Sequence, residues 1–427
     1  MYSRAINLHC VSHILALIGS NVTVRAKSPV PQLLDFMERI VQARNSLQFS
    51  TGWQDLFTKK LKRHSPTRWY SWYEVVCQVL EASLIDGGKT LEALFNSCVD
   101  ATEGEAVRNL KLQWSTRAQR VLLWAQMVAV VHGLKEAKEA TTLLEGDGFL
   151  TPLVYGQITK VKDGLESLLG RAGHGAPGAA GIGVDPSLFA QLGPLDRAEE
   201  AAVGPVLVSV LEQALDYVNK KFFADGPRAD NFVENLALYK ALAIFDPRNA
   251  AILDPDPRNA ESANVIDLLA GCEMMRRFRD TVNAGKKLTV IAALSKEWKT
   301  YVMRARAADV RAIEATSGGL ESFWKMARDA LPEWTSLARL AMTLTPSSAM
   351  VERVFSWLKY AWGSRKGGAL ESTVRCSLFL QYNPKTREWT RTPPIRSRIG
   401  NIQPAVAQLS AEHLICYCRR GGGSRPA

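Results

Sequence analysis

The chain has 427 residues, of which 47% are apolar and 22% are charged. This composition excludes a wholly disordered or fibrous protein, and the length predicts two or three structural units with a sizeable core. The formal net charge is +11 and it is concentrated: residues 39–72 and 385–427 each carry +6, so the rest sums to about −1. Two basic patches on a near-neutral body favour a polyanionic partner. The alternative is a solvated face and a disordered basic tail.

Neither the cysteines nor the apolar runs indicate secretion or membrane insertion. The seven cysteines are an odd number without zinc-finger spacing, which predicts a reducing compartment rather than a disulfide scaffold. The longest apolar stretch, residues 121–134, is shorter than the roughly 20 residues of a membrane span. We therefore predict a buried helix there and no membrane partner. His9, His13 and Asn21 interrupt the N-terminal apolar run, so a signal peptide is not expected.

Helical periodicity extends through most of the chain, and no convincing set of alternating strands occurs. The expected helical segments, in chain order, are residues 8–22, 36–47, 69–95 with a break at Gly87-Gly88, 105–133, 153–170, 195–223, 232–245, 266–284 and 288–306. A glycine-rich loop is expected at residues 171–186 and a loosely ordered basic tail at the end. The pentapeptide Asp-Pro-Arg-Asn-Ala occurs twice, at 246–250 and 256–260, as a local duplication.

The most distinctive string is Thr-Pro-Ser-Ser-Ala-Met-Val-Glu-Arg-Val-Phe-Ser at 345–356. Pro346 followed by two serines predicts a helix start, because a serine hydroxyl can cap free N–H groups. An apolar stripe follows, and Glu352 lies in the first turn beside it. The stripe consists of Val351, Val354, Phe355, Leu358 and Trp362.

This string resembles the C-terminal dimerisation region of hAT-family transposases. Residues 10–17 resemble the family's Cys-x-x-His-x-x-Asn-Leu helix, although Ala16 stands where asparagine is usual. Three further strings follow in family order: Thr67-Arg68-Trp69 with Ser71, Leu144-Glu145-Gly146 with residues 152–155, and Phe245-Asp246-Pro247-Arg248. The resemblance covers roughly residues 6–383.

The resemblance implies a mainly α fold, with a large helical domain and a truncated RNase H-like α/β remnant. The remnant is expected at residues 1–50, with the Cys-x-x-His helix. The helical insertion is expected at 51–310, with the glycine-rich loop at 171–186 inside it. The dimerisation region is expected at 311–384 and the basic tail at 385–427.

The family cleaves and transfers DNA strands with two divalent metals, held by two aspartates and one glutamate. Glu352 matches that glutamate, whereas both aspartates lie upstream of the Cys-x-x-His helix in the family and have no counterpart after Met1. We therefore expect a non-enzymatic, transposase-derived nuclear protein without a cofactor. The alternative is the C-terminal part of an active transposase whose upstream region is missing from the gene model, in which case Mg²⁺ would be used. For Glu352 itself the alternative is an exposed first-turn glutamate that favours the helix dipole.

The expected DNA-binding residues combine cations with an aromatic ring that can stack on a base. They are Lys59, Lys60, Lys62, Arg63, Arg68 and Trp69. The alternative is that Trp69 and the neighbouring Trp72 pack on the core. Cys10 and His13 are spaced like half of a zinc site, but a structural role is preferred because the other half is not evident.

Self-association is expected through the dimerisation region. The residues assigned to it are Val351, Val354, Phe355, Trp357 and Leu358. Trp357 lies roughly 200° around the helix from Phe355, so the helix has apolar residues on two sides. A second copy of the chain would cover the second side; the alternative is that both sides pack within the monomer. The expected partners are therefore another copy and DNA. A helical scaffold without a nucleic-acid role is a third alternative.

Overall fold

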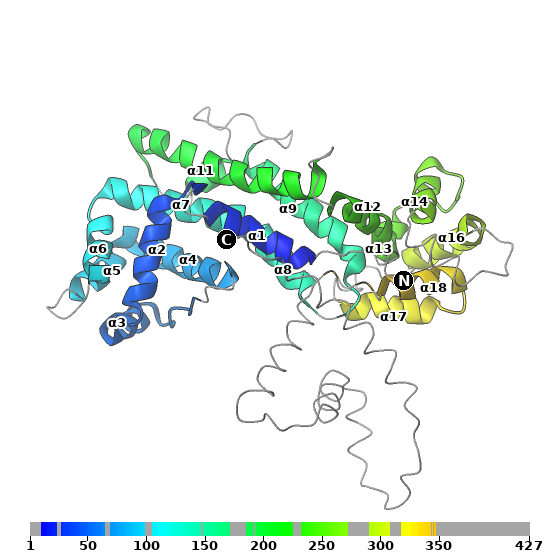
Figure 1. The fold of residues 1–427 in the computed structure, drawn as a ribbon, viewed down its shortest axis with the longest axis horizontal. Helices are drawn as coiled ribbons and strands as arrows, with labels where there is room; N and C mark the ends of the chain where they lie inside the picture. The colour runs from blue at the N-terminus through cyan, green and yellow to red at the C-terminus, as the bar shows by residue number, and fades with distance from the viewer. Residues whose placement is uncertain are drawn as a thin grey trace, which may run out of the picture. The chain divides into compact units, whose positions relative to one another are not determined.

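The computed structural model describes residues 10–23, 27–64, 69–98, 105–146, 148–170, 185–190, 192, 194–224, 232–271, 290–307, 317–342, 344 and 346 (Figure 1). Within these ranges every regular element is a helix, which confirms the prediction of a mainly α fold. The expected tail and nearly all of the glycine-rich loop lie outside the described residues.

The helices of the first two hundred residues carry most of the core. They are α1 (Val11–Thr23), α2 (Pro31–Ala43), α3 (Leu47–Phe57), α4 (Trp69–Leu84), the short turn η2 (Ile85–Gly88), α5 (Lys89–Ser97), α6 (Glu105–Trp114), α7 (Arg117–Gly133), α8 (Lys135–Leu144), η3 (Thr151–Leu153), α9 (Val154–Leu168) and α10 (Pro186–Ala190). The longest is α11 (Arg197–Val218), which continues into the π-helical turn η4 (Asn219–Phe223).

The second group of helices follows in the chain. It consists of α12 (Phe232–Leu242), η5 (Ala243–Phe245), α13 (Pro247–Ala251), α14 (Ala260–Gly271), α16 (Val290–Ala307), α17 (Ser317–Ala327) and α18 (Pro332–Met342).

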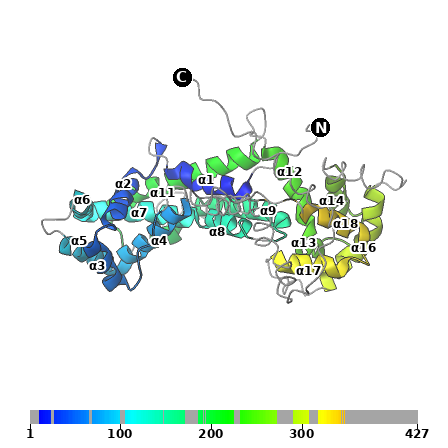
Figure 2. The same ribbon diagram turned by 60° about the horizontal axis from the view of Figure 1, so that its bottom comes forward.

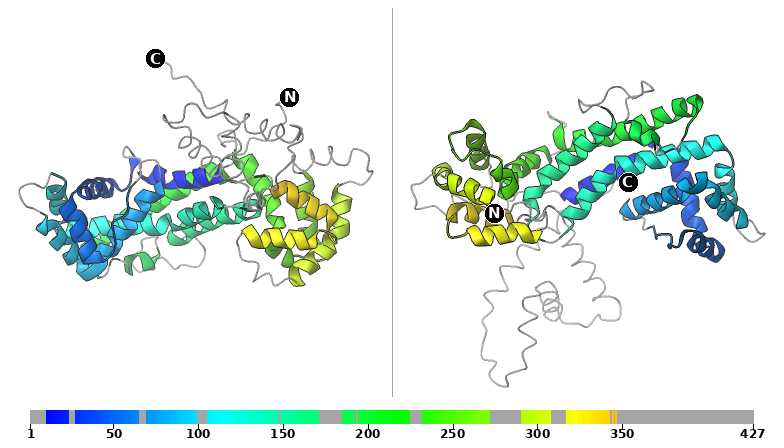
Figure 3. Two further views of the ribbon diagram at one scale, coloured as in Figure 1. Left: turned by 90° about the horizontal axis from the view of Figure 1, so that it is seen from below. Right: turned by 180° about the vertical axis from the view of Figure 1, so that it is seen from behind.

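Helix α7 is the centre of the first group, as expected for the apolar stretch at 121–134. Helix α11 runs alongside it, and α1 packs against α8 and α11 (Figure 3). Helix α2 packs against α6 (Figure 2). The buried Gln126 of α7 accepts the backbone N–H of Leu33 at 2.7 Å and donates to the side chain of Gln32 at 2.6 Å. It therefore satisfies a free N–H in the first turn of α2, which begins at Pro31.

One helical segment, Arg197–Phe223, is long and apolar enough to cross a membrane by length and composition. Its Val203, Leu207, Val210 and Leu211 side chains are fully buried in the core. Packing against α7 and α1 therefore accounts for the apolar character of this helix.

Several expected helix boundaries were wrong. Helix α2 begins at Pro31 and not at residue 36, and α14 begins at Ala260 and not at residue 266. Leu47 does not continue the second helix: it starts α3, where the Ser46 side chain accepts the N–H of Phe49, and it is 82% exposed. The expected helix over 105–133 is divided at residues 115–116, where Thr116 and Gln119 form a capping box for α7. The expected domain boundary after residue 50 falls inside α3, and residues on both sides of it share one core.

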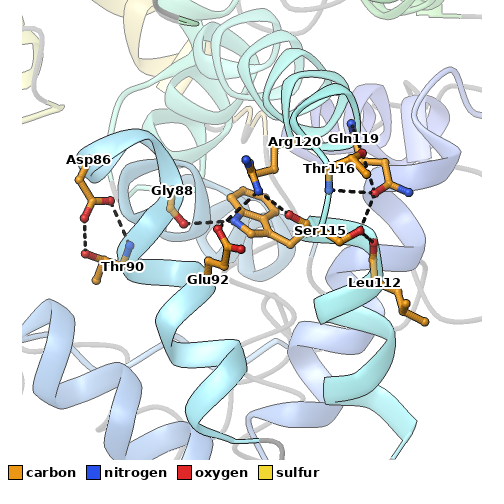
Figure 4. A network of polar contacts seen from close by, with 10 residues as sticks. Asp86, Gly88, Thr90, Glu92, Leu112, Ser115, Thr116, Gln119 and Arg120 are labelled. Carbon is orange, nitrogen blue, oxygen red and sulfur yellow. Dashed lines mark hydrogen bonds and ion pairs between the residues drawn. The ribbon is translucent and has the colours of Figure 1, made fainter.

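The predicted break at Gly87-Gly88 is confirmed, and Figure 4 shows the polar contacts around it. Gly87 and Gly88 have φ values of +67° and +83°, which suit glycine. The carboxylate of Asp86 accepts the N–H and the hydroxyl of Thr90 at 3.0 and 2.7 Å. These bonds start α5 by satisfying a free N–H in its first turn.

Trp114 and Arg120 connect this turn to α6 and α7. The indole N–H of Trp114 donates to the carbonyl of Gly88 at 3.2 Å. Arg120 donates to the carbonyl of Trp114 at 2.8 Å and lies 3.5 Å from the carboxylate of Glu92. The break between α4 and α5 is thus held by side chains from helices that come later in the chain.

An aromatic cluster forms the core of the second group. Its members are Phe245, Trp298, Tyr301, Phe323, Trp324 and Trp334. The three tryptophans all donate their indole N–H groups to backbone carbonyls, those of Asp254, Phe245 and Leu294. The indole N–H of a buried tryptophan usually finds such a partner, and each of these three rings has both its apolar body and its polar edge satisfied.

The two Asp-Pro-Arg strings form the same local turn in different surroundings. In each, the aspartate accepts the N–H and the guanidinium of the arginine two residues later. Asp246 is buried and begins α13, whereas the Asp256–Arg258 pair is largely exposed. The hydrogen bonds to Asp246 raise the pKa of Arg248. The duplication therefore repeats a turn, as expected, rather than a structural repeat.

Candidate nucleic-acid interface

Four of the predicted DNA-binding cations lie together on the surface between α3 and α4. They belong to a stretch that we call the basic segment, residues 59–63, and Lys59, Lys60, Lys62 and Arg63 are all exposed. Leu61 is only 5% exposed and holds the segment to the core, and Arg44 donates to its carbonyl at 3.0 Å. The segment is therefore an ordered surface in which one buried leucine lies between two pairs of exposed cations.

Helix α4 holds the basic segment through three polar residues that the sequence analysis did not identify. Gln78 donates to the carbonyl of Lys60 at 3.2 Å and accepts the N–H of Lys62 at 2.7 Å. Glu74 lies 3.1 Å from the ammonium of Lys62, and Glu81 lies 3.8 Å from that of Lys59. The signal for these residues was their spacing of four and three in a predicted helix, which places them on one face.

The remaining residues of the Thr-Arg-Trp-x-Ser string are only partly placed. Arg68 and the side chain of Trp69 lie outside the described residues. The ring of His64 lies 3.2 Å from the hydroxyl of Ser71, and burial lowers the pKa of His64, which favours its neutral form.

Two aromatic residues beside the string face inward. Trp72 is partly buried against the core, which supports the alternative that it packs there. Tyr73 is buried and donates to the carbonyl of Val131 at 2.9 Å. These two rings therefore contribute to packing on α7 rather than to an aromatic surface for bases.

Cys10 and His13 lie at the start of α1. The thiol of Cys10 is 3.4 Å from the backbone N–H of His13 and 3.2 Å from the hydroxyl of Ser12, while the His13 side chain is exposed. Among the described residues, no three metal-ligating side chains gather in one place. These contacts support the structural role, in which the cysteine caps the first turn of the helix.

Strings that are far apart in the sequence meet in the structure. Val11, in the Cys-x-x-His string, donates its backbone N–H to the carbonyl of Pro346 at 2.8 Å. Thr151 donates its hydroxyl to the carbonyl of Leu344 at 2.5 Å. Pro346 immediately precedes the Ser-Ser-Ala string. The start of α1 and residue 346 are therefore neighbours in space, although more than three hundred residues separate them in the sequence.

Two other strings from the sequence analysis, residues 152–155 and Phe245-Asp246-Pro247-Arg248, contribute residues to the lining of a cleft of about 550 Å³. Pro152, Tyr155, Asp246 and Arg248 are among its lining residues. Lys240 lies 5.9 Å from the centre of the Tyr155 ring. The guanidinium of Arg248 lies 2.6 Å from the carboxylate of Asp246. Of the two cations in the lining, Lys240 is therefore the one without a carboxylate partner among the described residues.

The predicted catalytic and dimerisation residues, Glu352, Val351, Val354, Phe355, Trp357 and Leu358, lie outside the described residues. Two other tryptophans of the expected dimerisation region are described. Trp324 and Trp334 are 1% and 0% exposed, and both lie in the aromatic cluster of this chain. They therefore do not provide an apolar surface for a partner, and the self-association prediction depends on residues 351–358.

Comparison with known proteins does not identify the chain. No family model matches it, and no curated protein matches it.

Proposed function

We propose that the chain is a hAT-like, transposase-derived protein that binds DNA through the basic segment and associates with itself through residues 351–358. The proposal includes an RNase H-like remnant that the helical body interrupts. Glu352 matches the metal-binding glutamate of the family, and the proposal itself concerns DNA binding and assembly.

The observation that carries the proposal is a contact between residues on either side of the expected helical insertion at 51–310, with Val11 before it and Pro346 after it. A domain that interrupts another must leave and re-enter it at neighbouring points, and insertions are tolerated where chain ends lie close together. The hydrogen bond from Val11 to Pro346, at 2.8 Å, provides that geometry. It also joins Val11 of the Cys-x-x-His string to Pro346, which belongs to the Thr-Pro-Ser-Ser string at 345–356.

The basic segment supports the DNA-binding part of the proposal. Its cations are exposed on a backbone that Leu61, Arg44 and Gln78 hold in place. An ordered row of cations can contact successive phosphates with little loss of conformational freedom on binding.

We expect DNA binding to be weak, independent of base sequence and strongly reduced by salt. Contacts to about six phosphates would give a slope near −5 when log affinity is plotted against log salt concentration. A variant with alanine at the four cations of the basic segment should lose about one unit of slope per contact removed. Fluorescence anisotropy with a labelled duplex at several salt concentrations measures both quantities.

The matched control replaces four exposed cations elsewhere in the chain with alanine, so that the net charge changes equally. Suitable positions are Lys111, Arg258, Lys299 and Lys325. The control should retain the slope of the original protein. Equal losses in both variants, or an affinity that salt does not change, would contradict binding at the basic segment.

We also expect the protein to form dimers or higher oligomers at micromolar concentration. Trp357→Glu should weaken association, because it places a charge on the second apolar side of the predicted helix. Glu352→Gln, five residues away in the same predicted helix, is the control and should have a smaller effect. Sedimentation velocity measures the distribution, and a monomer of 47.1 kDa at every concentration would reject this part of the proposal.

A further inference from the structure

One face of α4 presents three polar side chains to the basic segment. Glu74, Gln78 and Glu81 are spaced by four and three residues, so they project from the same side of the helix. Glu81 lies against Lys59 and Glu74 against Lys62, while Gln78 bonds the backbone between them. The two carboxylates are separated by about 10 Å along the helix, from seven residues at about 1.5 Å each.

We propose that Glu74 and Glu81 determine the specificity of the basic segment by competing with phosphates for Lys59 and Lys62. This inference rests on the proposed function, because it concerns the same surface. The two carboxylates occupy the lysines in the way that a bound polyanion would. A ligand can contact both lysines fully only when it displaces both carboxylates. Gln78 is a positioning residue that keeps the segment beside them.

The geometry of the pairs makes this exchange possible. The lysine and glutamate side chains of both pairs are between about one-third and three-quarters exposed, and the N–O distances are 3.1 and 3.8 Å. Exposed ion pairs of this kind are held weakly, so phosphates can displace the carboxylates. The carboxylates would remain close to the bound phosphates and would repel them, an effect that salt screens over about 10 Å.

The consequence is a preference for ligands with a high charge density. An isolated carboxylate or phosphate cannot replace two glutamates separated by about 10 Å, whereas a nucleic-acid backbone carries successive charges at shorter spacing. The same arrangement lowers the affinity for any polyanion. Four cations with two nearby carboxylates bind more weakly than four cations alone.

The test compares two double variants that change the net charge by the same amount. Glu74→Gln with Glu81→Gln removes the carboxylates at the basic segment. Glu139→Gln with Glu321→Gln removes two other ion-paired carboxylates, whose partners include Lys160 and Lys325. We expect the first pair to strengthen duplex DNA binding roughly five-fold at low salt, and the second less than two-fold, because the Coulomb energy falls with distance and screening.

Elution from immobilised heparin at increasing salt provides a second readout that does not require DNA. Equal DNA affinity and equal heparin elution of the two double variants would overturn the inference, even if the unmodified protein binds DNA and the proposed function stands. Later heparin elution of Glu74→Gln with Glu81→Gln, without DNA binding by any variant, would support the inference and reject the DNA function. No retention of any variant on either polyanion would reject both.

Discussion

Gly88→Ala is expected to destabilise the protein by about 2–5 kcal/mol. Two costs combine at this position. The residue has φ of +83°, where an L side chain is strained by about 1–2 kcal/mol. A Cβ atom there would lie 2.8 Å from the ring of Trp114, which is fully buried and cannot move freely, so overpacking adds about 1–3 kcal/mol.

Two other glycines separate these costs. Gly87 also has positive φ, +67°, but a Cβ there would meet no atom within 4 Å, so Gly87→Ala should cost only the backbone strain. Gly156 lies within α9 with open space around its Cβ position, so Gly156→Ala should be neutral or stabilise by up to about 1 kcal/mol. Urea unfolding followed by tryptophan fluorescence measures all three variants. Equal midpoints for Gly87→Ala and Gly88→Ala would contradict the close packing of Trp114.

Trp334→Ala is expected to cost about 3–5 kcal/mol in the stability of the second group of helices. The side chain is fully buried, and its ring centre lies 4.8 Å from that of Tyr301 and 5.5 Å from that of Trp298. Its loss leaves a cavity in the aromatic cluster and removes the hydrogen bond to the carbonyl of Leu294. The lost indole hydrogen bond adds to the cost.

Two further variants define the origin of that loss. Trp334→Phe keeps much of the ring and should be less destabilising, since it loses the indole N–H and only part of the volume. Met326→Ala, on the neighbouring helix α17, removes a side chain that is 74% exposed and should change stability by no more than about 0.5 kcal/mol. Near-ultraviolet circular dichroism during thermal unfolding follows the cluster. Similar midpoints for Trp334→Ala and Met326→Ala would show that the cluster does not hold these helices together.

The sequence predicted well those features that depend on neighbouring residues. The stripe of Val11, Leu15, Ile18 and Val22 is buried as its periodicity indicated, and residues 121–134 lie in a buried helix. The break at Gly87-Gly88 was predictable because glycine adopts positive φ at low cost. The errors at Leu47 and at residues 115–116 have a related origin: apolar periodicity continues across a cap, and the cap depends on one or two side-chain hydrogen bonds.

The candidate site was predictable only in part. The exposed cations of the basic segment were identified from their density in the sequence, but the carboxylates beside them were not. Glu74 and Glu81 follow the basic stretch along the chain, and the folding of α4 back along residues 59–62 brings them to the lysines. The local charge of the surface is therefore lower than the sequence count suggested.

By itself the sequence determined the helical class of this protein, most of its helices and the position of its cations, because these follow from local periodicity, backbone preference and composition. The tertiary structure alone decided which faces meet. It brought Val11 to Pro346, buried Trp324 and Trp334 within the chain, and placed α4 carboxylates against the basic segment. An amphipathic helix specifies which of its sides is apolar, but the partner of that side is chosen by packing among all the helices at once.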